Sequence, residues 1–236
     1  MFQRTFICLT WILITFATGF LPIQAQTQRN SDPPRSGRPP NRIDGGDRGR
    51  CSATKTSANK NLIALVPATG EALSTAESPT ILFYVPYASN SSLAARLSLQ
   101  DENGYGVIKP VQITLSEIPG IVSLRLPKQL EKNKLYHWFF TIICDTKNGT
   151  NNAGVDGWIR RIEPSPTLVR QLEKKSQQER AELYIKEGFW VDALALQLEM
   201  RHTNLQADTG WTNLLQNLDL RAIAPEKIVP CCTLKQ

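Results

Sequence analysis

The 236-residue sequence is 41% hydrophobic and 20% charged, which is ordinary for a globular protein and predicts a real hydrophobic core. Its length is enough for one medium domain and a smaller accessory unit. The formal net charge of +6 falls partly in a segment rich in proline and arginine. The charge therefore does not predict a nucleic-acid partner.

The N-terminus has the pattern of a secretory signal. Arg4 precedes an apolar run at residues 6–21, and Ala25 supplies the small residue that a signal peptidase needs. The run is short for a bilayer span, which takes about 20 apolar residues, so a cleaved signal at residues 1–25 is favoured over an uncleaved membrane anchor. The sequence thus predicts an exported protein of the periplasm, the cell envelope or the extracellular space.

Four cysteines remain after Cys8 leaves with the signal, namely Cys51, Cys144, Cys231 and Cys232. An even number in an exported protein favours disulfides. We pair Cys51 with Cys144, because the first precedes the first predicted strand and the second ends the most apolar one. Closing so long a loop contributes about 4 kcal/mol in the chain-entropy model. The adjacent pair Cys231–Cys232 stays open between a strained vicinal bridge, an intermolecular bridge and a metal site that lacks two ligands.

Residues 26–50 contain four prolines, four glycines and six arginines without hydrophobic periodicity. This composition predicts a disordered or polyproline-like linker. A solvated spacer is the favoured interpretation. The alternative is a basic tether that contacts anionic polysaccharide or lipid headgroups, and so makes peripheral membrane contact.

From residue 62 onward, short apolar runs alternate with turn residues, which is typical of an all-β domain. Seven strands are predicted, at residues 62–66, 80–85, 94–100, 107–115, 121–126, 135–144 and 156–162. This number is expected of an immunoglobulin-like antiparallel β-sandwich, which we place at residues 51–163.

The strand at residues 135–144 is predicted to be central, because both of its faces are mostly apolar. Period-two alternation places one set of side chains on the face of the predicted disulfide and the other set on the opposite face. The first set is Tyr136, Trp138, Phe140, Ile142 and Cys144, and the second is Leu135, His137, Phe139, Thr141 and Ile143.

Helical periodicity follows Pro166 and predicts a unit of three to four helices at residues 164–222, before a C-terminal tail at residues 223–236. The first helix covers residues 167–175. A capping box of Ser176 and Glu179 opens the second, which Gly188 ends. The third carries an apolar stripe, and the fourth begins with Asp208 as its cap. The stripe residues are Trp190, Ala193, Leu194, Leu198 and Met200, followed in the fourth helix by Trp211, Leu214, Leu215 and Leu218.

Residues 184–194 resemble the middle of a tetratricopeptide repeat. Gly188 stands at the turn between paired helices, and Ala193 stands where a small residue packs between them. A solenoid needs at least about three such units, and one is visible. This short tetratricopeptide-like hairpin is therefore predicted to dock on the sandwich.

Motifs spread over the chain together resemble the cyanobacterial family called domain of unknown function 928. They are Arg48-Gly49-Arg50-Cys51, Leu62-Ile63-Ala64-Leu65-Val66-Pro67, Phe83-Tyr84-Val85-Pro86, His137-Trp138, Cys144-Asp145, Gly157-Trp158-Ile159 and the turn at residues 188–194. The resemblance covers most of the chain after residue 25. It implies an exported protein with a sandwich followed by helices, and it implies no activity.

No motif for catalysis is present. The two histidines, His137 and His202, have no metal-ligand spacing, and His137 is interpreted as a satisfied strand residue. Neither a nucleophile elbow nor a phosphate-binding glycine loop occurs. Asp145, Asp156 and Glu163 flank the last two strands, where a glycosidase pair is conceivable, but turn chemistry is the favoured interpretation, above all for Asp156-Gly157. We predict no catalytic residue, cofactor or metal, while an active site built from distant loops stays open.

Four aromatic residues are the candidates for contact with a partner: Tyr87, Tyr105, Phe189 and Trp190. Core packing is favoured for Trp190 and Trp211. The prediction is a non-catalytic module of the cell envelope that engages another envelope protein and no nucleic acid. The alternative is an envelope protein that binds or processes carbohydrate, with polysaccharide as its partner.

Overall fold

The computed structural model describes residues 40–44, 54–55, 61–88, 93–116, 118–144, 151–203, 208–230 and 233–235. All of them belong to one compact unit, Pro34–Gln236. Its described strands are β1 (Thr54–Lys55), β2 (Ile63–Ala64), β3 (Glu71–Ser74), β4 (Thr80–Val85), β5 (Tyr87–Ala88), β6 (Leu93–Asp101), β7 (Val111–Leu115), β8 (Gly120–Arg125), β9 (Leu135–Ile143), β10 (Ala153–Arg161) and β11 (Thr233–Lys235).

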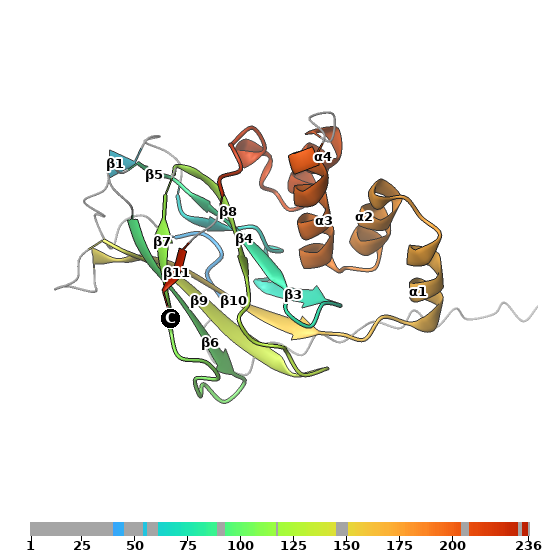
Figure 1. Ribbon diagram of the computed structural model, residues 1–236, viewed down its shortest axis with the longest axis horizontal. Coiled ribbons are helices and arrows are strands. Elements are labelled where there is room, and N and C mark those ends of the chain that lie inside the picture. The colour runs from blue at the N-terminus through green and yellow to red at the C-terminus, as the bar shows by residue number, and fades with distance from the viewer. Residues whose placement is uncertain are drawn as a thin grey trace, which may run out of the picture. The chain divides into compact units, whose positions relative to one another are not determined.

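Two sheets pack against each other (Figure 1). One has six strands in the order β11-β7-β6-β9-β10-β3, and the other has three in the order β2-β4-β8. In chain order, β2, β4 and β8 correspond to strands A, B and E of an immunoglobulin domain, while β6, β9 and β10 correspond to C, F and G. The predicted fold class is therefore confirmed. Among the described strands, β3 departs from a purely antiparallel sandwich, because it pairs in parallel with β10.

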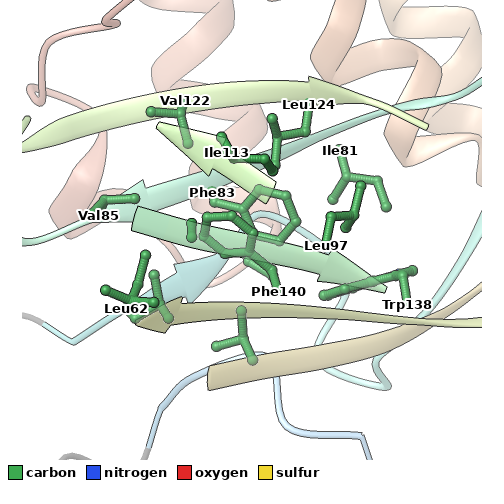
Figure 2. Close-up of a cluster of buried hydrophobic side chains, with 14 of the residues drawn as sticks. Leu62, Ile81, Phe83, Val85, Leu97, Ile113, Val122, Leu124, Trp138 and Phe140 are labelled. Atoms are coloured by element: carbon green, nitrogen blue, oxygen red, sulfur yellow. The ribbon is translucent and has the colours of Figure 1, made fainter. Parts of the chain in front are cut away.

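The core lies between the two sheets and is centred on aromatic rings (Figure 2). The ring of Phe83 on β4 stacks on Phe140 of β9, with centroids 4.2 Å apart, and meets the edge of Trp138 at 5.6 Å. The predicted inward face of β9 is at most 1% exposed from Tyr136 to Ile142. Because β9 pairs with β6 on one side and β10 on the other, its predicted central position is also confirmed.

The predicted turn at Asp156-Gly157 is wrong, since both residues lie inside β10, which begins three residues earlier than expected. Gly157 pairs with Trp138 on β9. A Cβ atom at Gly157 would overlap the indole ring of Trp138 and lie 2.9 Å from the carbonyl oxygen of Gly70. Gly157 is therefore required because there is no space for a side chain at this position. The sequence alone does not distinguish such a glycine from a turn glycine.

Residues 40–44 belong to the predicted linker, yet they are part of the fold. The backbone of Asn41 exchanges hydrogen bonds with Asp156, and Ile43 forms a bridge with Ile63. Nη1 of Arg42 donates to the carbonyl oxygens of Val66 at 2.9 Å and of Leu218 at 2.8 Å. Backbone and side-chain hydrogen bonds order this segment, which is why hydrophobic periodicity did not reveal it.

The helices described after β10 are α1 (Pro166–Glu173), α2 (Gln177–Lys186), α3 (Trp190–Thr203) and α4 (Asp208–Asn217), then the short 3-10 helix η3 (Arg221–Ile223). The predicted capping box of Ser176 and Glu179 is present at the start of α2. Gly188, with φ of +81°, ends the α2–α3 turn as predicted. Asp208 is the first residue of α4.

The helices α3 and α4 cover the outer face of the three-stranded sheet (Figure 1). Leu82 and Tyr84 of β4 point into this second core, where Trp211, Leu214 and Leu215 of α4 meet them. Nε1 of Trp211 donates to the carbonyl oxygen of Ala224 at 3.1 Å. Burial, and then the charge and hydrogen bond of Glu226, raise the pKa of Tyr84 to about 12. β4 is therefore buried on both faces, which explains its unbroken apolar sequence.

A carboxyl group near the start of α3 ties that helix to the sandwich. Asp192 accepts hydrogen bonds from the backbone N–H of Thr75, at 3.1 and 3.2 Å, and from its hydroxyl group at 2.8 Å. Thr75 directly follows β3, so the contact joins α3 to the β3–β4 connection. The helical unit is therefore attached to the sandwich by the hydrogen bonds of Asp192 as well as by the apolar contacts of the second core.

We expect Asp192 to make the stability of the fold depend on pH. Burial raises its pKa above the ordinary 3.8, and hydrogen bonds from Thr75 and Ser74 offset part of the rise. A carboxyl group with a raised pKa binds more protons in the folded chain, so its contribution is complete below pH 3.8 and falls as pH rises through the folded pKa. In urea titrations, the difference in unfolding free energy between wild type and Asp192→Asn should decline over this range. A difference that does not change with pH contradicts the prediction.

Candidate interaction surface

The helices α1 and α2 lie on the side of α3 that faces away from the sheets (Figure 1). Each contributes one fully buried residue, Leu168 in α1 and Ala181 in α2. Their remaining residues are half-buried or exposed, and Val169 is an exposed large apolar side chain at 39%. Most residues of α1 and α2 are therefore at least partly accessible to solvent, and few are buried in the fold.

A groove of about 480 Å³ separates α1 from α2. Two leucines and eight polar or charged residues line it, with side chains of both signs. The lining residues are Ser165, Thr167, Leu168, Gln171, Lys175, Glu179, Glu182, Leu183, Lys186 and Glu187. Polar and charged side chains of both signs around a small apolar area are found at the rim of protein–protein contacts.

Both helices that form this groove begin with a side-chain cap. The hydroxyl oxygen of Ser165 accepts from the N–H of Leu168 at 3.1 Å, and the capping box of Ser176 and Glu179 opens α2. The backbone N–H and then the hydroxyl group of Ser176, followed by Lys175, lower the pKa of Glu179 to about 2. Because a cap satisfies N–H groups that the helix itself leaves free, these helices hold their shape with little burial.

The four aromatic candidates lie in different environments. Tyr87 is 1% exposed and Phe189 is 2% exposed, so neither is an exposed anchor. Burial, and then the charge of Asp44, raise the pKa of Tyr87 to about 12. Trp190 is partly buried against the second core, as favoured from the sequence. Tyr87 follows Pro86 as the first residue of β5, and its side chain belongs to the core between the sheets.

Tyr105 is 73% exposed at the tip of the connection between β6 and β7. One carboxylate oxygen of Asp101 accepts the N–H groups of Asn103 and Tyr105, both at 2.9 Å. The N–H of Asp101 donates to the carbonyl oxygen of Tyr105, and Gly104 adopts a φ of +86°. These bonds present the Tyr105 ring on a well-formed turn.

The strand residue His137 is paired, as its interpretation required. Nε2 of His137 lies 2.7 Å from Oδ2 of Asp156, and its ring stacks on Trp158 at 4.1 Å. The centroid of the Phe139 ring also lies 4.1 Å from that of the imidazole, with the two rings tilted by 42°. The other oxygen of Asp156 accepts the N–H of Asn41 at 3.3 Å. This pair on the outer face of the six-stranded sheet therefore joins β9, β10 and the N-terminal segment.

Of the carboxylates considered for sugar hydrolysis, Asp156 and Glu163 do not form a pair. Asp156 and Glu163 are seven positions apart along extended chain, a span of roughly 23 Å, whereas glycosidase carboxyl groups lie about 5–9.5 Å apart. Lys132, at 2.7 Å, lowers the pKa of Glu163, which opposes a role as general acid.

Asp145 lies outside the described residues, as do Cys51, Cys231 and Cys232. The predicted pairing of Cys51 with Cys144 stays a prediction.

No helix in the described part of the chain is long and apolar enough to cross a membrane. Nor do the described residues contain a cluster of three or more His, Cys, Asp or Glu side chains arranged to hold a metal ion.

The sequence did not reveal the groove between α1 and α2 or a second one, which lies between α2 and α4 and is lined in part by Gly210. Most of the lining residues are polar or charged side chains spaced three or four positions apart, which is also the pattern of a solvated helix face. Gly210 was the one available signal, because a glycine within a helix costs stability unless space requires it.

The fold and its grooves define a class of protein, an immunoglobulin-like sandwich that carries an external helical unit. The chain itself belongs to the family described as Domain of Unknown Function (DUF928), whose model matches residues 43–228, well over half of its length. This confirms the resemblance found in the sequence. No match was found among curated proteins.

Proposed function

We propose that the protein is an exported, non-catalytic module of the cell envelope that engages another envelope protein through its helical unit. One observation carries the proposal: α1 and α2 are capped at their N-termini, yet each buries a single residue. Two ordered helices that add little to the core are well suited to present a surface to a partner. Export is supported by the signal pattern of residues 1–25.

In-cell photo-cross-linking tests this proposal. The photoreactive residue replaces Val169 in one variant and Gln171 in another, both exposed on α1. The matched control carries it at Arg96, which is exposed on β6 of the sandwich. We expect the same protein adduct from both helical positions and none from Arg96. Mass spectrometry identifies the adduct, and the absence of any protein adduct at Val169 and Gln171 would overturn the proposal.

Tyr105 favours a second candidate function, the binding of polysaccharide by the sandwich. Its exposed ring on a well-formed turn can stack on a sugar, and the same turn carries the exposed side chain of Asn103. A polysaccharide ligand should raise the melting temperature by mass action, and Tyr105→Ala should abolish the rise. If cell-wall glycan leaves the melting temperature of the wild type unchanged, this alternative fails.

A further inference from the structure

A second groove, of about 290 Å³, runs between α2 and α4 above α3. Gln178, Glu182 and Ile185 lie along the α2 side at a spacing that places them on one helix face. Gly210, Asn213 and Asn217 do the same on α4. Gln197 of α3 lies at the base, 1% exposed. We call this the amide groove, because four carboxamide side chains line it.

A chain of hydrogen bonds sets the orientation of these amides. Nε2 of Gln197 donates to Oε1 of Gln178 at 3.2 Å, and Nε2 of Gln178 donates to Oε1 of Glu182 at 3.0 Å. An ionised carboxylate only accepts, so the chain runs in one direction. It leaves the buried Oε1 of Gln197 without a donor among the described residues. A buried acceptor without a partner is unfavourable, and a bound donor would remove that cost.

Gly210 keeps the space that this arrangement needs. A Cβ atom there would lie 2.8 and 3.0 Å from the amide nitrogen and oxygen of Gln197, and 3.1 Å from Oε1 of Gln178. Glycine weakens the interior of a helix relative to alanine. Its presence in α4 is explained by the close approach of Gln197.

The lining residues indicate the chemistry of the ligand. Asn213 and Asn217 are exposed carboxamides, and each offers both donors and an acceptor, as a peptide bond does. Glu182 and Lys186 carry opposite charges, so the amide groove has no net charge to attract an ion. No aromatic side chain is among its lining residues, whereas sugars and bases are held largely by stacking on aromatic rings.

We propose that the amide groove binds a short, extended and uncharged peptide segment of the partner protein. This inference rests on the proposed function and names the site and chemistry of the contact. The carboxamides of Asn213 and Asn217 bond the peptide backbone, and the half-buried Ile185 contacts an apolar side chain of the segment. Oε1 of Gln197 is covered in the free chain. A peptide N–H reaches it once a side chain at the rim has moved.

Selection from a phage-displayed library of short random peptides tests this proposal. We expect the full chain to enrich peptides without net charge. Their affinity should fall at least about tenfold in the double variant Asn213→Ala, Asn217→Ala, since both changes remove hydrogen bonds at the contact. The matched control is Gln216→Ala, an exposed change on α4 outside the groove, which should leave affinity unchanged.

Two further readouts separate binding in the groove from binding elsewhere. The side-chain amide resonances of Gln197 should shift when a selected peptide is added to isotope-labelled protein. Gly210→Ala should weaken binding while the melting temperature shows that the chain still folds. Failure to enrich any peptide, or equal binding by the wild type and the double variant, overturns the proposal that the amide groove binds a peptide. If cross-links at Val169 still capture a protein in that case, the proposed function stands without this site.

Discussion

Replacing Gly157 with alanine is expected to lower the free energy of unfolding by about 3 kcal/mol, the upper end of the usual cost of overpacking a core. The added methyl group would overlap the indole of Trp138, which is 0% exposed, and would press on the backbone of Gly70. Neither neighbour moves easily, because Trp138 packs edge-on against Phe83 and Gly70 accepts the N–H of Trp158 at 2.7 Å. Chemical denaturation of the two proteins measures the difference.

The same strand offers a matched control. Gly154 also lies in β10, but a Cβ atom there would be 3.7 Å from its nearest neighbours, which is ordinary contact. Gly154→Ala should therefore change stability by much less than Gly157→Ala. Adding Trp138→Phe to Gly157→Ala should recover part of the loss, because a smaller ring leaves room for the methyl group. Equal costs for the two alanine variants would contradict the explanation.

Loss of the predicted disulfide between Cys51 and Cys144 is expected to cost about 4 kcal/mol of unfolding free energy. The bridge would close a loop that contains most of the sandwich, so its removal enlarges the conformational freedom of the unfolded chain. We expect the variant Cys51→Ser, Cys144→Ser to unfold at a lower denaturant concentration than the oxidised wild type. Under reducing conditions, the wild type and the variant should unfold at the same midpoint.

Peptide mapping without reduction tests the disulfide directly. A peptide that joins Cys51 to Cys144 is the expected product. Free thiols at both positions in the exported protein would contradict the pairing, as would a bridge from either residue to Cys231 or Cys232. The position of Cys144 suits the expected bond, because it follows β9 and packs against the main core.

Much of the candidate site was beyond the reach of the sequence. The capping box of Ser176 and Glu179 is a local pattern, so α2 and the turn at Gly188 were predicted correctly. The exposure of an aromatic ring depends instead on what packs over it. Tyr87 and Tyr105 both follow a turn signal, yet one is 1% exposed and the other 73%. The amide groove likewise needs three helices in their packed arrangement.

The main strands of the sandwich follow from patterns within short windows of this sequence. Alternation along β9, the apolar run of β4 and the turn residues between them specify strands, and seven such strands favour two packed sheets. Local patterns carry this information because side chains alternate with the backbone period. The contacts between distant parts are of another kind. Three examples are the hydrogen bond from Arg42 to Leu218, the space that Gly157 leaves for Trp138, and the hydrogen bonds between Thr75 and Asp192. No local pattern predicts which residues meet in these contacts, because they form only when distant parts of the chain pack together.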